Sequence, residues 1–226
     1  MAADLATGPL EVRVFSGPMM GENAYLVRGR GHDTAVAIDP GEGAVAMAGA
    51  LEAEGLALEA ILLTHAHFDH IEGVADLVRR TGAPIYLHPD ARPWYDRAPE
   101  QAALFGMRVE APPPPSHALG HGQLLELGGT RFEVRDAPGH APGHVILYVE
   151  DAGVAFVGDV VFQGSIGRTD LPGGDFQQLM RSIREQVLSL PDHTVLYPGH
   201  GPETTVGHER ATNPFLAPQY RGGFLA

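Results

Sequence analysis

The densest group of chemically reactive side chains lies in the segment THAHFDH, residues 64–70. His65 and His67 are two residues apart, so in an extended segment their side chains leave on the same side. Asp69 continues that side if the backbone stays extended, and His70 precedes a predicted helix. The apolar run AILL stands just before this segment and is typical of a buried strand. A strand that ends in this loop aims four metal-binding side chains at one small volume.

Further histidines and aspartates follow other predicted strands. DAPGHAPGH places His140 and His144 in a glycine- and proline-rich loop, FVGDVVF places Asp159 at a strand end, and LYPGHGP does the same for His200. Imidazole and carboxylate ligands suit zinc, iron or manganese. Seven ligands are too many for one tetrahedral zinc ion, but they fit two metals that share Asp159 and a bridging hydroxide. The candidate ligands are His65, His67, Asp69, His70, His140, Asp159 and His200.

The elements that must position these residues are short strands and fewer helices. Alternating or continuous apolar runs predict strands at residues 10–15, 23–29, 34–38, 59–64, 83–89, 123–137, 145–150, 153–159 and 193–199. Helical patterns cover residues 44–55, 71–82 and 175–190. Residues 90–122 predict a helix followed by a surface excursion. The strands form two groups, each followed by helices, which predicts helices covering two packed sheets.

Composition restricts the function further. The 226 residues predict a single domain over 1–226, with residues 1–8 as a loose tail. The absence of cysteine excludes disulfides and thiolate ligands, and the absence of lysine excludes Schiff-base chemistry. A net charge of −13 argues against nucleic-acid and anionic-membrane partners. Without a membrane span, a secretory signal or cysteine, the expected location is the cytoplasm. The oligomeric state is not predicted.

The ordered motifs HxHxDH, PGH, GD and PGH resemble those of the metallo-β-lactamase superfamily. This resemblance implies an α/β fold, a four-layer αβ/βα sandwich. The strings NAYLV, GSIGRTDLPGGD and PGHGPETT resemble the short bacterial glyoxalase II-like (hydroxyacylglutathione hydrolase-like) hydrolases, and the matching stretches run from Asn23 to Phe215. The resemblance implies one metal held by His65, His67 and His140 and a second held by Asp69, His70 and His200. Asp159 would bridge the two metals, and Asp69 and Asp159 would be the catalytic carboxylates.

The implied reaction is the hydrolysis of a small acyl thioester, with S-D-lactoylglutathione as the leading candidate. Two divalent ions, zinc in the first place and iron or manganese as alternatives, would lower the pKa of a bridging water to roughly 7. A thiol has a pKa of about 8.5, so a thiolate leaves without much help from a general acid. The hydroxide attack therefore needs no protein nucleophile.

Three further residues have predicted supporting roles. Arg168 lies where glyoxalase II has a basic residue that contacts the glycine carboxylate of glutathione, although it could pair with Asp170 or Asp175 instead. Asp39 either hydrogen-bonds a ligand histidine or caps a helix. His144 resembles a residue that supports the ligands without being one. Only 26 residues follow His200, too few for the helical domain that binds glutathione in glyoxalase II, so we expect a shallow pocket with a weak hold on the peptide part of glutathione.

Three other functions compete with thioester hydrolysis. Persulfide dioxygenases share HxHxDH and use one iron held by residues that match His65, His140 and Asp159, the 2-His-1-carboxylate pattern. A β-lactamase or lactonase is a second alternative, and a nucleic-acid processing or binding module is a third. Metal content discriminates between the first alternative and the hydrolase, because one predicts a single iron and the other predicts two ions.

Overall fold

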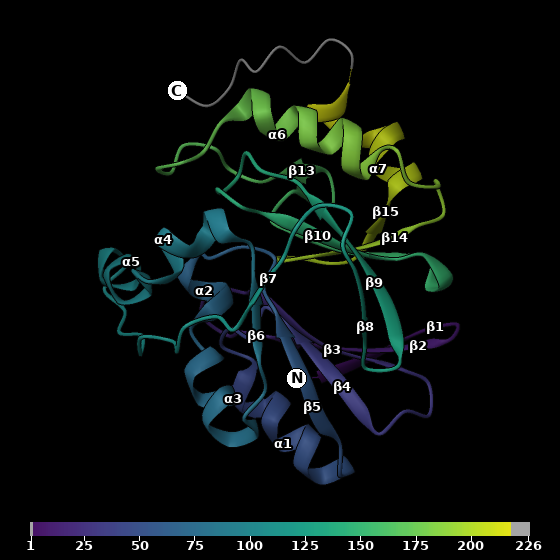
Figure 1. The fold of residues 1–226 in the computed structure, drawn as a ribbon. Coiled ribbons are helices and arrows are strands. Elements are labelled where there is room, and N and C mark those ends of the chain that lie inside the picture. The colour runs from purple at the N-terminus through teal and green to yellow at the C-terminus, as the bar shows by residue number, and fades with distance from the viewer. Residues whose placement is uncertain (1, 218–226) are drawn as a thin grey trace.

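The structure is a computed structural model that describes residues 2–217, and two β-sheets packed face to face form its centre (Figure 1). The N-terminal sheet has seven strands in the order β1 to β7. They are β1 (Ala2–Thr7), β2 (Leu10–Ser16), β3 (Asn23–Gly29), β4 (Thr34–Ile38), β5 (Ala57–Leu62), β6 (Ile85–Leu87) and β7 (His117–Ala118). Strands β1 to β4 pair antiparallel, whereas β4 to β7 pair parallel.

The C-terminal sheet has six strands in the order β15-β14-β11-β10-β9-β8. They are β8 (Leu124–Leu127), β9 (Thr130–Asp136), β10 (Val145–Val149), β11 (Val154–Gly158), β14 (Val195–Pro198) and β15 (Thr204–Thr205). Strands β11 and β14 pair parallel, and the other pairs are antiparallel. A separate small hairpin joins β12 (Val161–Phe162) to β13 (Ser165–Ile166).

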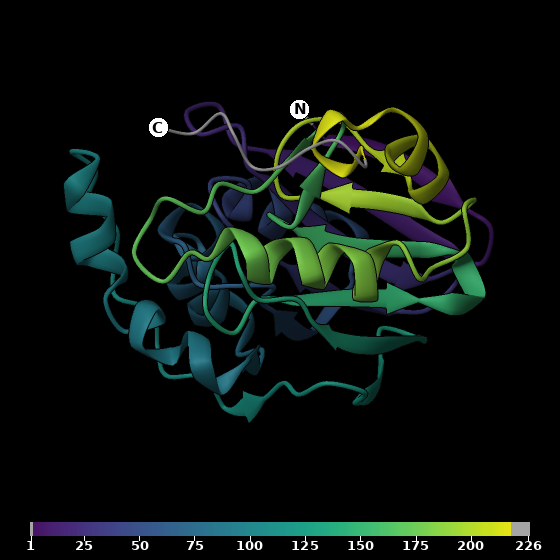
Figure 2. The same ribbon diagram turned by 90° about the horizontal axis from the view of Figure 1, so that it is seen from above.

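Helices cover the outer faces of both sheets (Figure 1). The α-helices are α1 (Ala44–Glu54), α2 (Phe68–Ile71), α3 (Val74–Thr81), α4 (Arg92–Tyr95), α5 (Ala98–Leu104), α6 (Phe176–Ser182) and α7 (Val206–Thr212). Helix α6 continues as a π-helical turn over Ile183–Val187, and short 3-10 turns occur at Pro89–Ala91, Glu150–Ala152 and Pro214–Leu216. Figure 2 shows α6 lying along its sheet, while α4 and α5 lie to one side of the sandwich.

Three hydrophobic clusters hold these layers together. One lies between α1, α3 and the N-terminal sheet, with Met47 and Leu77 completely buried. A second fills the space between the two sheets, where Phe132 and Phe156 are at most 1% exposed. A third lies between the C-terminal sheet and α6. Burial of apolar surface is the main stabilising contribution in such a sandwich, and the arrangement confirms the predicted four-layer αβ/βα fold.

The prediction of a loose tail over residues 1–8 is wrong for the residues that the structure describes. Ala2–Thr7 form β1, which pairs antiparallel with β2 from Ala2 opposite Phe15 to Thr7 opposite Leu10. Gly8 has a φ of 57°, which suits the tight turn that joins the two strands. The prediction failed because AADLAT lacks the β-branched pattern of a strand, and pairing with the backbone of β2 holds it in place. The single domain over 1–226 remains a prediction, and residues 1 and 218–226 lie outside the described residues.

Within residues 2–217, every helix is too short or too polar to cross a lipid bilayer.

Candidate metal site

The candidate ligands gather at one edge of the sandwich because parallel strands end there together. Strands β4 and β5 are parallel neighbours in one sheet, and β11 and β14 are parallel neighbours in the other. Asp39 directly follows β4, the THAHFDH segment follows β5, Asp159 follows β11, and His200 follows β14. The loop between β9 and β10 brings His140 and His144 to the same edge. Strand-end loops on a rigid sheet are where α/β folds place their functional side chains.

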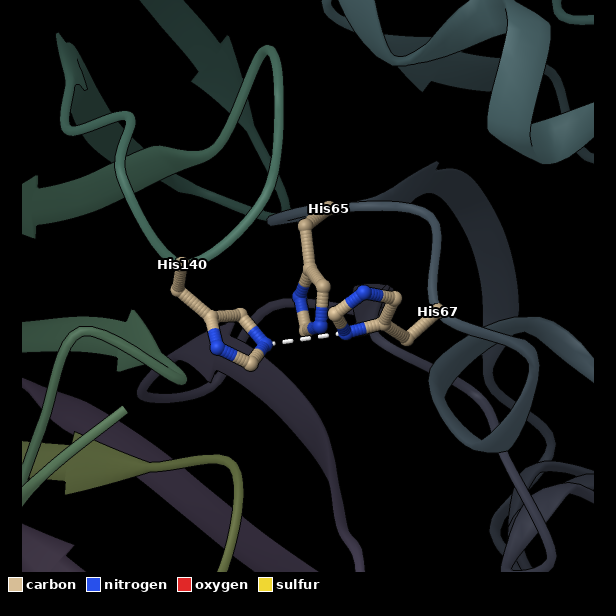
Figure 3. Close-up of side chains that lie close together, drawn as sticks. All are labelled: His65, His67 and His140. Atoms are coloured by element: carbon tan, nitrogen blue, oxygen red, sulfur yellow. Dashed lines mark hydrogen bonds between the residues drawn. The ribbon is translucent and has the colours of Figure 1, made fainter. Parts of the chain in front are cut away.

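His65, His67 and His140 form the first group (Figure 3). One ring nitrogen of each lies within 4.8 Å of the others, a spacing that a single ion can bridge. His140 Nε2 lies 2.9 Å from His67 Nδ1, while His140 Nδ1 donates to the backbone carbonyl of Arg168 at 2.8 Å. The first two histidines come from the N-terminal half of the chain and the third from the C-terminal half, so the packing of the two sheets creates this group.

Asp69, His70 and His200 form the second group, with donor atoms again within 4.8 Å. His200 Nε2 lies 3.2 Å from Asp69 Oδ2. The condition that the backbone stays extended through Asp69 is not met, and the prediction that His70 precedes the helix is wrong. His67 is still extended, but helix α2 begins at Phe68 and contains both Asp69 and His70. This helical turn separates the segment into two pairs of side chains, one for each group.

The Asp159 carboxylate lies between the two groups. Its Oδ1 is 3.4 Å from His70 Nε2, and its Oδ2 is 3.5 Å from His140 Nε2 and 3.7 Å from His200 Nε2. The backbone N–H of Asp159 donates to His144 Nε2 at 3.1 Å. The His144 ring stacks on His65 with centroids 4.7 Å apart. His144 thus contacts the backbone of Asp159 and the ring of His65, both candidate ligands, and its supporting role stays a prediction.

Asp39 supports the ligands through a chain of hydrogen bonds. Its carboxylate accepts from the backbone N–H of Thr64 at 2.7 Å and from Thr64 Oγ1 at 2.6 Å, and its Oδ2 lies 3.2 Å from His70 Nδ1. Thr64 Oγ1 in turn lies 3.0 Å from His65 Nδ1. The alternative role as a helix cap is wrong, because α1 begins after Gly43 and has no side-chain cap. With Nδ1 of both histidines engaged, Nε2 of both is free to face the site.

The all-histidine group is neutral at physiological pH. Burial lowers the pKa of His65 well below its ordinary value, and the neighbouring histidines lower it further. Burial, followed by the charge of His140, lowers the pKa of His67 to about 3. Burial also lowers the pKa of His140. Only the neutral imidazole has a lone pair for a cation, so these three side chains are ready to bind a metal.

The second group carries charge instead. Burial opposes a charged His70, but Asp159 and Asp69 raise its pKa well above 6.5. The pKa of His200 is likewise raised, since contacts with Asp69 and Asp159 outweigh its burial. The pKa values of Asp69 and Asp159 are lowered despite burial, chiefly by the charge of His70. Without a metal ion, the protonated histidines therefore balance the negative charges of Asp69 and Asp159, which a cation would otherwise balance.

The donor atoms fit metal ions. Within the described residues, His65 Nε2, His70 Nε2 and Asp159 Oδ1 are buried and have no hydrogen-bond partner. Buried polar atoms without partners are rare and costly in folded proteins, and coordination to a cation would satisfy them. Gly199 leaves room for this arrangement, because a Cβ there would overlap Asp159 Oδ1 and the His70 ring.

A cavity of about 350 Å³ opens over these side chains. His67, Asp69, His140, Asp159 and His200 form part of its lining. Its volume is in the range of small-molecule sites.

Arg168 also lines the cavity, as expected for a substrate contact. Its guanidinium, however, makes two hydrogen bonds of 2.7 Å to the carboxylate of Asp170, the first of the two partners that the sequence offered. Its role in substrate binding remains a prediction.

Glu22, Thr64 and Gly199 belong to the site but were not singled out in the sequence. Glu22 is fully buried, neither of its carboxyl oxygens has a hydrogen-bond partner among the described residues, and burial raises its pKa well above the ordinary range. The available signals were weak: Glu22 directly precedes the NAYLV strand, Thr64 directly precedes His65, and Gly199 directly precedes His200. None of these residue types reveals a metal site by itself.

Two sheets in a four-layer sandwich with clustered histidines and aspartates at one edge define a metallo-hydrolase fold and site. The chain belongs to the metallo-beta-lactamase superfamily, whose family model matches residues 18–200. It is 41% identical over 202 residues to "Probable metallo-hydrolase YqgX" of Bacillus subtilis (strain 168), covering 88% of this chain and 94% of that one. It is 40% identical over 184 residues to "Hydroxyacylglutathione hydrolase GloC" of Haemophilus influenzae, covering 80% of this chain and 87% of that one.

Solved structures give the same family. A B3 metallo-beta-lactamase, BLEG-1, superposes with a TM-score of 0.85 at 41% identity, covering 91% of this chain and 99% of that chain. TTHA1623 in a di-iron-bound form has a TM-score of 0.81 at 45% identity, with 89% and 98% covered. ETHE1 from Myxococcus xanthus has a TM-score of 0.75 at 27% identity, with 91% and 84% covered.

Proposed function

We propose that this chain is a two-metal hydrolase of small acyl thioesters of the glyoxalase II type, with S-D-lactoylglutathione as the reference substrate. The observation that carries the proposal is the position of Asp159, whose two carboxylate oxygens lie 3.4–3.7 Å from histidines of both groups. One carboxylate shared between two clusters is the arrangement that two-metal hydrolases use. The name of the relative GloC supports the hydroxyacylglutathione substrate.

Each metal would be held by one of the two groups, with zinc, iron or manganese compatible with the donors. The bound ions would supply a polarised carbonyl and a water of lowered pKa. The protein supplies the positions: Asp39, Thr64 and the Arg168 carbonyl hold the ligand rings, and His144 holds the backbone of Asp159. Asp69 and Asp159 line the cavity, so their carboxylates can orient a water beside the substrate carbonyl.

The leaving group favours thioesters over amides at this site. A thiol with a pKa of about 8.5 departs as a thiolate, whereas an amine must be protonated as it leaves. The chain has neither cysteine nor lysine, so nucleophilic catalysis through those side chains is excluded. Direct attack by an activated water is therefore the route that we propose.

Persulfide oxygenation by a single iron is the second candidate, and the similarity to the solved ETHE1 structure favours it. His65, His140 and Asp159 would supply the 2-His-1-carboxylate ligands of such an iron. Asp69, His70 and His200 converge into a second group that could hold a second ion, and this supports the two-metal proposal over the one-iron candidate.

Elemental analysis beside parallel activity assays tests the proposal. The purified protein should contain two metal ions per chain and hydrolyse S-D-lactoylglutathione, as followed by the release of free thiol. Oxygen uptake with glutathione persulfide and hydrolysis of the β-lactam nitrocefin are measured on the same preparation. Oxygen uptake without thioester hydrolysis would establish the dioxygenase instead, and nitrocefin turnover alone would establish a β-lactamase.

A further inference from the structure

The walls of the cavity above the candidate metal site are mostly apolar. Of its nine lining residues that are not candidate ligands, six are apolar. They are Met20, Phe68, Phe105, Phe162, Ile166 and Leu171. They come from three places in the chain: the loop between β2 and β3, the α2 and α5 region, and the β12–β13 hairpin with the loop that follows it. Segments far apart in sequence thus build one apolar wall around the candidate ligands.

Part of the apolar surface of this wall is exposed to solvent and can be buried by a ligand. The Phe105 side chain is 52% exposed although its ring lies 5.2 Å from that of Phe68. Met20, Phe162 and Ile166 are only half-buried. Each methylene group that leaves water on binding contributes favourable free energy. A substrate with an apolar group beside its carbonyl would gain this free energy on binding.

Two of the three polar lining residues outside the candidate ligands, Gln101 and Arg168, are already hydrogen-bonded within the protein. Gln101 Nε2 donates to the carbonyls of Ala66 and Trp94 at 2.9 and 2.8 Å. Arg168 is the one arginine among the described lining residues, the chain has no lysine, and Asp170 binds Arg168 through two hydrogen bonds. Because the pair is solvent-exposed, a substrate carboxylate could displace Asp170 at little cost. The freed Asp170 charge would then stand next to that carboxylate and cancel most of the gain.

We infer that this cavity selects thioesters whose thiol and acyl parts are uncharged and apolar, with Phe105, Phe162 and Ile166 as the residues that determine this preference. The inference rests on the proposed thioester hydrolysis and restricts its substrate class. Glutathione thioesters, which carry a net negative charge, rank below neutral ones. The net charge of −13 on the chain also favours neutral substrates, because it repels anions before they bind.

A matched pair of substrates tests the charge preference. S-D-lactoylglutathione and S-D-lactoyl-N-acetylcysteamine share one acyl group and differ in the charge of the thiol part. With the metal-loaded protein, we expect kcat/KM to be at least tenfold higher for the neutral thioester. An equal or higher kcat/KM for the glutathione thioester would overturn the inference and leave the proposed function intact. No hydrolysis of either would overturn both.

A series of acyl groups tests the apolar wall. Acetyl, butyryl and hexanoyl thioesters of N-acetylcysteamine should show kcat/KM rising roughly two- to fourfold for each added methylene until the cavity is full. Phe105→Ala and Ile166→Ala should each reduce that gain. Leu104→Ala is the matched control, because Leu104 is 86% exposed and does not line the cavity. A flat series in the wild-type protein would overturn the inference.

Releasing Arg168 provides an independent check. Asp170→Ala leaves the guanidinium without its partner, so kcat/KM should rise several-fold for the glutathione thioester and stay constant for the neutral one. Both residues of the pair are more than half exposed, so the substitution should not disturb folding, which circular dichroism verifies. A rise for both thioesters alike, or for neither, would contradict the charge argument.

Discussion

At the scale of single residues, the site depends on which atom of each histidine faces inward. Hydrogen bonds at Nδ1 engage His65, His70 and His140 through Thr64, Asp39 and the Arg168 carbonyl, respectively. Among the described residues, Nε2 of His65 and His70 has no hydrogen-bond partner, and Nε2 of His140 faces His67 Nδ1 at 2.9 Å. The sequence motif gives the candidate ligands, whereas the hydrogen-bond partners of their rings determine the tautomers.

Asp159→Ala should abolish activity and leave the fold nearly intact. Asp159 contacts histidines of both groups, so its loss removes negative charge from both candidate metal positions. We expect the metal content to fall below two ions per chain and kcat to fall by at least a hundredfold, with little change in Tm of the metal-free protein. Elemental analysis and thiol release measure both effects. Asp151→Ala, at an exposed carboxylate away from the site, is the control. Near-normal turnover in the Asp159 variant would make Asp159 structural.

Acidification should release the two metals at different pH values. The pKa values of His70 and His200 are raised above 6.5, so protons compete with metal at the second group already near neutral pH. The pKa of His67 is about 3, so the first group stays neutral far into the acid range. Metal content after dialysis should therefore fall from two ions to one as the pH falls through the neutral range, and the last ion should leave only well below that range. Simultaneous loss of both ions would contradict this order.

At the scale of elements, close contacts between strand ends define the site. The backbone N–H of Thr64 at the end of β5 donates to Asp39 at the end of β4, and Gly199 brings the end of β14 against Asp159 and His70. Asp39 adopts a φ of 47°, the one positive value of a non-glycine residue among the described residues. Strain of this kind persists where surrounding contacts hold it, and here the Thr64 hydrogen bonds do so.

Gly199→Ala should damage the site more than the fold. The added Cβ would overlap Asp159 Oδ1 and the His70 ring, so both side chains must move from the metal position. We expect kcat/KM to fall by at least tenfold while Tm drops by only a few degrees. Gly49→Ala is the matched control, because nothing lies within 4 Å of its Cβ and it stands inside α1, where alanine is favoured. If the Gly199 variant is active and binds two metals, the loop can shift to accommodate the Cβ, and the expectation is wrong.

Strands and candidate ligands could be predicted from the sequence where the residue types themselves indicate them. Alternating and continuous apolar runs located the longer strands, and the histidines and aspartates at the strand ends gave the candidate site. The prediction failed for β1, because AADLAT has no apolar pattern typical of a strand. This segment forms a strand through its backbone pairing with β2. It missed the helical turn of α2, because HFDH does not reveal where extended backbone ends. Glu22 was missed because its burial depends on the packing of distant segments rather than on its own neighbours.

At the scale of the whole molecule, the net charge of −13 acts on every substrate that approaches. Such a field slows the association of anions and is screened over a Debye length of about 10 Å at 0.1 M salt. Raising the salt concentration from about 0.02 to 0.3 M should increase kcat/KM severalfold for S-D-lactoylglutathione and leave the neutral N-acetylcysteamine thioester unchanged. Sodium sulfate at equal ionic strength controls for specific anion effects. A fall for the glutathione thioester would point to an attractive patch at the cavity mouth.

The division of the ligands between the two sheets has a consequence for biosynthesis. The N-terminal sheet and THAHFDH leave the ribosome first, but His140, Asp159 and His200 follow later. At about 5–20 residues per second, roughly ten to thirty seconds separate Asp39 from His200. A nascent chain ending before β14 would contain all three histidines of the first group but would lack His200 of the second. Metal acquisition would then be stepwise in time, with the second ion captured only by a nearly finished polypeptide.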